Sequence, residues 1–229
     1  MKTLALFDLD NTLLAGDSDK TWNQFLIDRG ILDAEASRIA NDQFYADYCA
    51  GTLDMEAYLA FALAPLTRFS KEELDAMHQD FMRDYIRPMM TAEAQALVKQ
   101  HLDAGAVVMI ITATNRFVTA PIAAAFGVPH LIATEAEMID NRYTGKSFDV
   151  PCFQSGKITR LEQWFAAQQL DWSSFEDSWF YSDSHNDLPL MKLVKHPVAV
   201  DPDPMLKRYA DQHGWPVISL RTHHRPSGV

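Results

Sequence analysis

The sequence has 229 residues, of which 48% are hydrophobic and 22% are charged. These values are typical of a globular protein with a substantial core, and they exclude extensive disorder and fibrous repeats. The net charge of -11 opposes long-range attraction to nucleic acid or to an anionic membrane. We therefore expect one large domain, or a domain with an insertion, that binds neither nucleic acid nor membrane.

Compartment signals in the sequence are few and agree with each other. The apolar run at the N-terminus is too short for a signal peptide, and no window approaches the roughly 18 apolar residues of a membrane span. Cys49 and Cys152 cannot build a disulfide framework. We expect a cytoplasmic protein.

The first two predicted strands both end in polar residues. Residues 4–7 are a short apolar run that leads into Asp8-Leu9-Asp10-Asn11-Thr12, and residues 107–111 are a second run ended by Thr112. Between these runs, a helix is predicted from an N-cap at Thr91 to Ala104. The order strand, helix, strand implies that the two strands are parallel.

The same alternation continues toward the C-terminus. Helices are predicted over 117–126, 158–169, 188–193 and 205–213, strands over 179–181, 197–200 and 217–218, and a hairpin over 135–148. We therefore predict an α/β fold with a doubly wound, mainly parallel sheet.

A long helical segment interrupts this pattern after the first strand. Residues 16–87 carry helical spacing throughout, and Ser70 with Glu73 forms a capping-box signature. The segment contains fourteen acidic and seven basic residues, so most of the net charge lies there. We predict an all-helical cap over 16–87, inserted into a core formed by 1–15 and 88–229.

Polar side chains follow three strands at the edge where a doubly wound sheet places its site. They are Asp8 and Asp10 after the first strand, Thr112 after the second, and Asp183 and Asp187 after the strand at 179–181. Each of these residues, taken alone, can be explained as a helix cap without any role in catalysis. Because all of them are predicted at one sheet edge, we expect a functional site there.

The residue types at this edge indicate phosphoryl transfer. Oxygen ligands without His or Cys favour magnesium, and an EF-hand is excluded because its glycine position holds leucine in both aspartate loops. Magnesium and a lysine can neutralise phosphoryl oxygens while one carboxylate attacks phosphorus and a second moves the proton.

These residues resemble the four motifs of the haloacid dehalogenase superfamily of phosphatases. Asp8-Leu9-Asp10-Asn11-Thr12 is similar to the first motif, Thr112 to the second, Lys157 to the third, and residues 183–187 to the fourth. The motifs follow in order along nearly the whole chain. The insertion after the first motif resembles the helical cap of the phosphoserine-phosphatase-like branch.

The resemblance implies a role for each matching residue. Asp8 would be the nucleophile that forms an aspartyl-phosphate, and Asp10 would protonate the leaving alcohol and then activate water. Thr112 would hydrogen-bond the transferring phosphoryl group, and Lys157 would offset its charge. Magnesium would be held by the carboxylates of Asp8 and Asp183 and the backbone carbonyl of Asp10.

The fourth motif also implies supporting residues. Asp187 would act behind the metal ligands, and Asn186 would lie near the phosphate. Ser182 and Ser184 stand where related enzymes often have glycine. We expect these serines to change the stiffness of the loop more than its chemistry.

The expected substrate is a small phosphorylated metabolite. Asp17 stands at the spacing from Asp8 where phosphoserine phosphatases place the acid that meets the substrate amine, whereas no Arg or Lys occurs between Arg38 and Arg68 to meet a carboxylate. An amino alcohol phosphate without a carboxylate suits this pattern. The chain is similar to bacterial histidinol phosphatases of the superfamily, which implies histidinol phosphate.

Aromatic residues of the cap offer a partner for an imidazole ring. Trp22, Tyr45 and Tyr48 are candidates, although aromatics at helical spacing are more often core residues.

Several alternatives remain open from the sequence. Phosphoserine, ethanolamine phosphate and choline phosphate are alternative candidates for the substrate. A phosphotransferase, which passes the phosphoryl group to another alcohol, would use the same residues. A receiver-like signalling module also forms an aspartyl-phosphate on a doubly wound sheet. It has no use, however, for Asp10 or for the helical cap.

Overall fold

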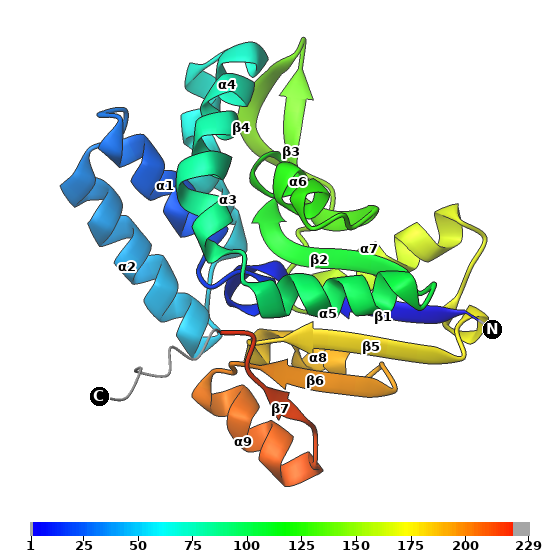
Figure 1. Ribbon diagram of the computed structural model, residues 1–229. Coiled ribbons are helices and arrows are strands. Elements are labelled where there is room, and N and C mark those ends of the chain that lie inside the picture. Colours follow the sequence, from blue (N-terminus) through cyan, green and yellow to red (C-terminus); the bar gives the residue numbers. More distant parts are fainter. Residues whose placement is uncertain (1, 222–229) are drawn as a thin grey trace, which may run out of the picture.

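The computed structural model describes residues 2–221 (Figure 1). Within that range the chain forms a seven-stranded sheet in the order β4-β3-β2-β1-β5-β6-β7. The strands are β1 (Thr3–Phe7), β2 (Val107–Asn115), β3 (His130–Ile139), β4 (Arg142–Phe148), β5 (Asp177–Ser182), β6 (His196–Val200) and β7 (Val217–Ile218). Neighbouring strands are parallel except for β3 and β4. The predicted fold class is confirmed.

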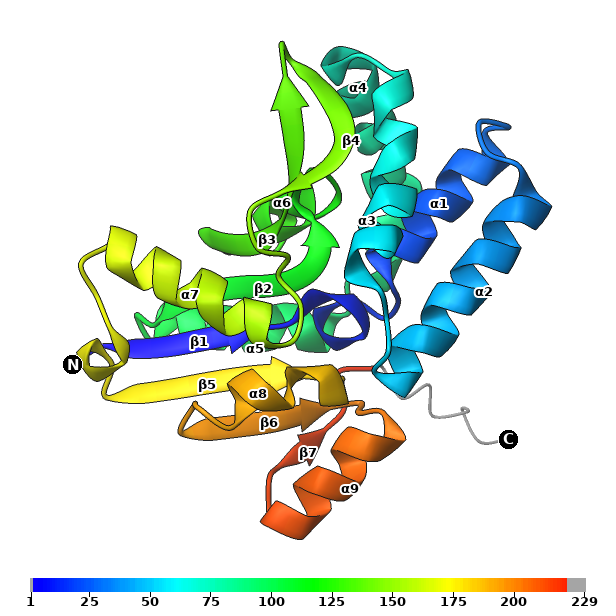
Figure 2. The same cartoon turned by 180° about the vertical axis from the view of Figure 1, so that it is seen from behind.

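Helices cover both faces of the sheet because its central strands are apolar on both sides. Ala5 and Phe7 of β1 pack on one face, and Leu4 and Leu6 pack on the other. The first face is covered by α5 (Ala92–Asp103) and α6 (Arg116–Ala125), and the second by α7 (Ser155–Ala167), α8 (Leu188–Met191) and α9 (Pro204–His213). Figure 2 shows α7 and α8 in front of the strands and α5 behind them.

Four more helices stand over the end of the sheet where β1 and β5 terminate (Figure 1). They are α1 (Ser18–Asp28), α2 (Ala34–Ala50), α3 (Met55–Leu63) and α4 (Lys71–Phe81). The predicted capping box of Ser70 and Glu73 opens α4. The hairpin of β3 and β4 packs against α3, so the helical layer also touches the core segment of the chain. The division into a core and a cap at residues 15 and 88 stays a prediction, and residues 222–229 of that core lie outside the described range.

Short helical turns complete the chain. They cover Leu9–Leu13, Ala64–Arg68, Met82–Ile86, Arg87–Met89, Trp172–Ser174 and His185–Asp187. None of the helices in the described range is both long and apolar enough to cross a bilayer.

Several predicted elements begin or end at other residues in the structure, and two of these differences lie in β2 and β3. Strand β2 does not end at Thr112 but continues to Asn115, with a shift of register against β3. Strand β3 begins at His130, before the predicted hairpin, because its first half pairs with β2 and only its second half pairs with β4.

Candidate active site

Asp8 lies directly after β1, at the centre of the sheet edge. Its backbone N–H donates to the carbonyl of Tyr181 on β5, so the sheet ladder continues up to this residue. Its Oδ1 accepts a hydrogen bond from Lys157 Nζ at 2.8 Å. Burial raises the pKa of Asp8 to about 6, against the attraction of Lys157.

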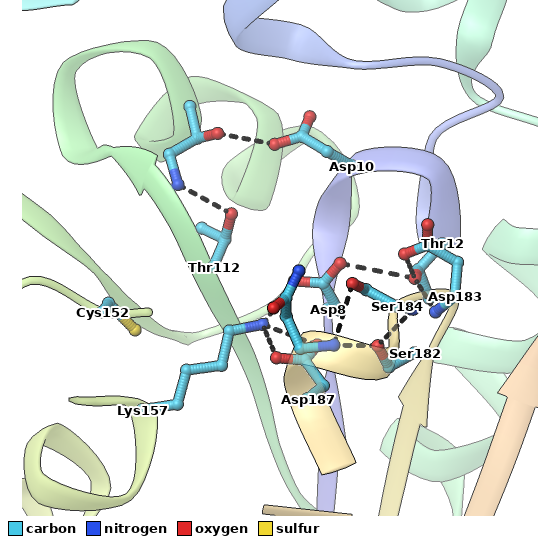
Figure 3. Close-up of polar contacts among 12 residues, drawn as sticks. Asp8, Asp10, Thr12, Thr112, Cys152, Lys157, Ser182, Asp183, Ser184 and Asp187 are labelled. Carbon is cyan, nitrogen blue, oxygen red and sulfur yellow. Dashed lines mark hydrogen bonds and ion pairs between the residues drawn. The ribbon is translucent and has the colours of Figure 1, made fainter. Parts of the chain in front are cut away.

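Lys157 joins two carboxylates in the buried part of the site (Figure 3). Besides Asp8, its Nζ reaches Asp187 Oδ1 at 2.7 Å. Burial alone lowers the pKa of an amine, but attraction to Asp187 and Asp8 raises the pKa of Lys157 above its usual range. Lys157 lies in the first turn of α7. The preceding residue, Gly156, allows this turn to pass close to Pro151, because a Cβ at position 156 would stand 2.1 Å from the Pro151 carbonyl oxygen.

Asp10 lies two residues after the nucleophile candidate, and both of its carboxylate oxygens are bound. Oδ1 accepts from the N–H of Ser18 at 2.6 Å, and Oδ2 pairs with the hydroxyl of Thr114 at 2.7 Å. Burial, together with repulsion from Asp17, raises the pKa of Asp10 to about 8. A carboxyl group with this pKa carries its proton at neutral pH and is suited to act as a general acid.

Asp183 faces Asp8 across the hydroxyl of Thr12 (Figure 3). Thr12 Oγ1 donates to Asp183 Oδ1 at 2.9 Å and lies 3.4 Å from Asp8 Oδ2. Burial and repulsion from Asp8 raise the pKa of Asp183 well above its usual range. The two carboxylates therefore present oxygens to the same space, and a cation there would relieve their repulsion.

The oxygens of Asp8 and Asp183 on either side of Thr12 form a site that fits magnesium. In the described part of the chain, no three His, Cys, Asp or Glu side chains gather closely enough to hold a metal by themselves. Magnesium does not need such a cage, because it commonly keeps several waters and uses one or two carboxylates. Asp8 and Asp183 supply those two, and the Thr12 hydroxyl between them is a further oxygen donor.

The loop after β5 is held by the two serines of the fourth motif. Ser182 Oγ donates to Asp187 Oδ2 at 2.6 Å and accepts from the N–H of Ser184. Ser184 Oγ accepts from the N–H of Asn186 and caps the turn His185–Asp187. These hydrogen bonds give a physical basis for the expected change in loop stiffness.

Thr112 and Thr114 lie near the end of β2, on the same face of the strand. Thr112 is buried, and its Oγ1 accepts a hydrogen bond from the backbone N–H of Thr114. Thr114 was not among the predicted site residues. Its position two residues after Thr112 was the available signal, because alternate residues of a strand share one face.

A cavity between the sheet edge and the helices brings the predicted residues together. Asp8, Asp10, Thr112 and Lys157 line it, together with Asn186 and Asp187. Asp183 lies beside it, bound to Thr12.

The helical side of the cavity is aromatic and acidic. Its aromatic lining consists of Phe44, Tyr45, Tyr48 and Tyr58, and Phe153 lines the cavity from the loop before α7. Asp17 also lines it and, at the same time, caps α1 by accepting from the N–H of Lys20. Lys20, which was not among the predicted site residues because it lies before the stretch between Arg38 and Arg68, also lines the cavity.

Trp22 does not serve as a cavity wall. It is 1% exposed and packs against Phe25, Phe81 and Phe117 in the core. The suggestion that Trp22 faces a substrate ring is therefore wrong, whereas Tyr45 and Tyr48 do line the cavity.

Comparisons with known proteins agree with the four motifs. Residues 5–192 match the family of haloacid dehalogenase-like hydrolases. A histidinol-phosphatase of Neisseria meningitidis serogroup C is 46% identical over 96% of this chain and 100% of its own. A phosphoserine phosphatase of Mycobacterium tuberculosis is 30% identical over 98% of this chain and 73% of its own.

Two solved structures extend the comparison. A protein of unknown function from Bordetella pertussis Tohama I superposes with a TM-score of 0.91 at 47% identity, covering 96% of this chain and 100% of that one. A substrate-bound phosphoserine phosphatase shares the fold, with a TM-score of 0.68 at 19% identity over 96% of this chain and 94% of that one. The motifs, the fold and these relatives together show that the chain belongs to the haloacid dehalogenase-like hydrolase family.

Proposed function

We propose that the protein is a magnesium-dependent phosphatase that converts L-histidinol phosphate to L-histidinol and phosphate, a step of histidine biosynthesis. The observation that carries the proposal is the cavity, which joins the four motif sites to a wall of aromatic rings and carboxylates. The histidinol-phosphatase of Neisseria, similar over its whole length, supports the same substrate.

Asp8 and Asp10 divide the chemistry between them. Asp8 attacks phosphorus, a bond forms between its carboxylate oxygen and phosphorus, and the bond from phosphorus to the alcohol oxygen breaks. Asp10, which has a pKa of about 8, gives its proton to the departing alcohol oxygen. Asp10 then removes a proton from the water that hydrolyses the aspartyl-phosphate, so both carboxyl groups return to their first state.

Lys157 and Thr112 assist the transfer by contacting the phosphoryl oxygens. The ammonium group of Lys157, 2.8 Å from Asp8, offsets negative charge on the phosphoryl oxygens. The Thr112 hydroxyl donates to one of those oxygens. Asn186 lies near the phosphate, and Asp187 holds Lys157 in place through the ion pair between the two side chains.

Magnesium is the cofactor that we propose for this site. Asp8, Asp183 and the backbone carbonyl of Asp10 would hold it, and it would supply charge neutralisation at the phosphoryl group. The facing oxygens of Asp8 and Asp183 around Thr12 support this assignment.

The cavity wall supports an aminated substrate without a carboxylate. Asp17 can pair with an ammonium group, and the aromatic side chains can pack on an imidazole ring. Among the described residues, no arginine lines the cavity to bind a carboxylate in bidentate fashion. The two free thiols, Cys49 and Cys152, support the further proposal that the reaction takes place in the cytoplasm.

Phosphoserine is the second candidate, and one observation favours it. Lys20 lines the cavity, with its Nζ 5.7 Å from the centre of the Tyr45 ring, and could meet the carboxylate of phosphoserine. Ethanolamine and choline phosphates satisfy Asp17 but leave the aromatic side chains without a ring partner.

A panel of phosphorylated metabolites tests the proposal. The purified protein with magnesium is given histidinol phosphate, phosphoserine, ethanolamine phosphate and choline phosphate, and released phosphate is measured. We expect the highest kcat/KM for histidinol phosphate. A preference for phosphoserine would reverse the substrate assignment, transfer to an added alcohol would indicate a phosphotransferase, and a single phosphorylation without turnover would indicate a receiver-like module.

A further inference from the structure

Helix α2 forms one wall of the cavity although the rest of the chain holds it loosely. Asn41, Phe44, Tyr45 and Tyr48 of this helix line the cavity. Yet Ser37 is its one buried residue in the described part of the chain. Figure 1 shows α2 as the outermost of the four added helices, with its C-terminal end close to the ends of β5 and β6. Phe44 packs on Tyr58 and Phe61 of α3, and the contacts at the C-terminal end of α2 fix the rest of the wall.

Tyr48 makes those contacts with the loop that follows β5. Its hydroxyl donates to Ser184 Oγ at 2.8 Å. Its backbone carbonyl accepts from Asn186 Nδ2 at 3.3 Å, and its ring lies 5.9 Å from that of Phe153. Both the side chain and the main chain of Tyr48 thus bind the fourth motif.

Ser184 transmits this contact to the site. Its Oγ accepts from Tyr48 and also from the N–H of Asn186 at 3.2 Å, so both lone pairs of the hydroxyl are used. The capped turn ends at Asp187, which binds Lys157 at 2.7 Å, and Lys157 binds Asp8 at 2.8 Å. Hydrogen bonds, together with the main chain from Asn186 to Asp187, therefore join α2 to the nucleophile candidate.

We propose that Tyr48 is a positioning residue, which acts through the Ser184 hydroxyl to hold the turn 185–187 in place beside the phosphoryl site. The proposal rests on the proposed phosphatase reaction but not on the identity of the alcohol. Burial and the nearby charges of Asp183 and Asp187 raise the pKa of Tyr48 well above its usual range, so its hydroxyl stays a donor. A glycine at position 184 could not receive this hydrogen bond.

Substitution of the hydroxyl groups tests the proposal. Tyr48→Phe should lower kcat about three- to tenfold, as expected for one lost hydrogen bond. It should do so equally for histidinol phosphate and for p-nitrophenyl phosphate, with KM little changed, because the turn acts on the phosphoryl group. In a Ser184→Ala background, Tyr48→Phe should cause no further loss.

A matched control separates position from general stability. Tyr85 also lies in the added helical segment, and its hydroxyl donates to Asp28 at 2.5 Å on the surface. Tyr85→Phe should leave both kinetic constants unchanged. Losses that multiply in the double variant, or a loss confined to histidinol phosphate, would instead make Tyr48 a substrate contact and overturn the proposal.

Amide hydrogen exchange provides a readout that does not depend on activity. Tyr48→Phe should speed exchange in a peptide spanning 183–187, Ser184→Ala should do the same, and the double variant should resemble Ser184→Ala alone. If no phosphomonoester is hydrolysed, the proposed function fails, and exchange alone decides the role of Tyr48. Unchanged exchange in Tyr48→Phe would refute that role even in an active enzyme.

Discussion

Thr114 binds Asp10 across 104 positions of sequence, with 2.7 Å between Thr114 Oγ1 and Asp10 Oδ2. The other oxygen of Asp10 accepts from the N–H of Ser18, the first residue of α1. The proposed acid and base of the reaction is therefore held between β2 of the core and the first added helix. Its orientation depends on both.

Thr114→Val should lower kcat about tenfold while leaving the fold intact. Valine keeps the shape of the side chain but cannot bond to Asp10, so the carboxyl group loses one of its two fixed contacts. Steady-state kinetics with histidinol phosphate measure the effect.

Thr159→Val is the matched control, because Thr159 lies exposed on α7 and bonds only to its own helix. Equal kcat values in the Thr114 and Thr159 variants would show that Asp10 needs no support from β2.

Asp8→Asn should abolish turnover, with kcat lower by a factor on the order of 10⁴ or more. The amide cannot attack phosphorus, and it is a poorer ligand for a cation. Lys157 still has Asp187 as its partner, so the variant should fold. Phosphate release and circular dichroism test the two statements.

Asp211→Asn serves as its control, because Asp211 pairs with Lys207 on the surface of α9. Substantial turnover in the Asp8 variant would disprove its assignment as nucleophile.

The sequence predicted the convergence of the site but not the contacts that support it. Asp8 and Asp183 follow parallel strands, Thr112 lies near the end of another, and the ends of such strands meet by rule. The pairing of Thr114 with Asp10 depends instead on β2 running four residues beyond its apolar run. Likewise, the bond between Tyr48 and Ser184 depends on how a helix docks on a loop 136 positions away, and no local pattern encodes that distance.

Removal of magnesium should abolish activity, and calcium should inhibit, because its larger and looser coordination shell disturbs in-line transfer. Magnesium should also raise the melting temperature more at higher pH. The pKa of Asp8 is raised to about 6, so below that pH a proton competes with the metal. A chelator, calcium substitution and thermal unfolding between pH 5 and pH 8 check these outcomes.

Activity that survives the chelator would contradict a metal-assisted reaction. A magnesium effect on melting that is the same at pH 5 and pH 8 would place the metal away from Asp8.

The buried carboxyl group of Asp19 should lower the free energy of unfolding as pH rises from 4 to 6. It is 4% exposed, and its oxygens bind Tyr58 and Asn115. Burial and repulsion from Asp17 raise its pKa from 3.8 to about 6. The folded state thus holds the proton more tightly than the unfolded state, and the free energy of unfolding falls by roughly 2 kcal/mol between pH 4 and pH 6.

Asp19→Asn should remove this part of the slope, as measured by urea unfolding at pH 4, 5, 6 and 7. Asp103→Asn, at an exposed position on α5, should keep the slope of the unmodified protein. Parallel slopes in all three proteins would exclude the buried carboxyl of Asp19 as a source of pH dependence.

Asp17→Asn should lower kcat/KM for histidinol phosphate by about ten- to a hundredfold. A carboxylate paired with the substrate ammonium contributes roughly 1.5 to 3 kcal/mol, and the amide keeps no charge for that pair. Hydrolysis of p-nitrophenyl phosphate, which has no amine, should change much less. Both substrates are measured with the same preparation.

The role of Asp17 as N-cap of α1 does not confuse this test. Asparagine caps a helix about as well as aspartate, so the hydrogen bond from the N–H of Lys20 is retained. Asp33→Asn makes the same exchange at the N-cap of α2, away from the cavity lining, and should alter neither substrate. Equal losses on both substrates in Asp17→Asn would assign Asp17 to the architecture of the site, since only a contact with the amine can distinguish the two esters.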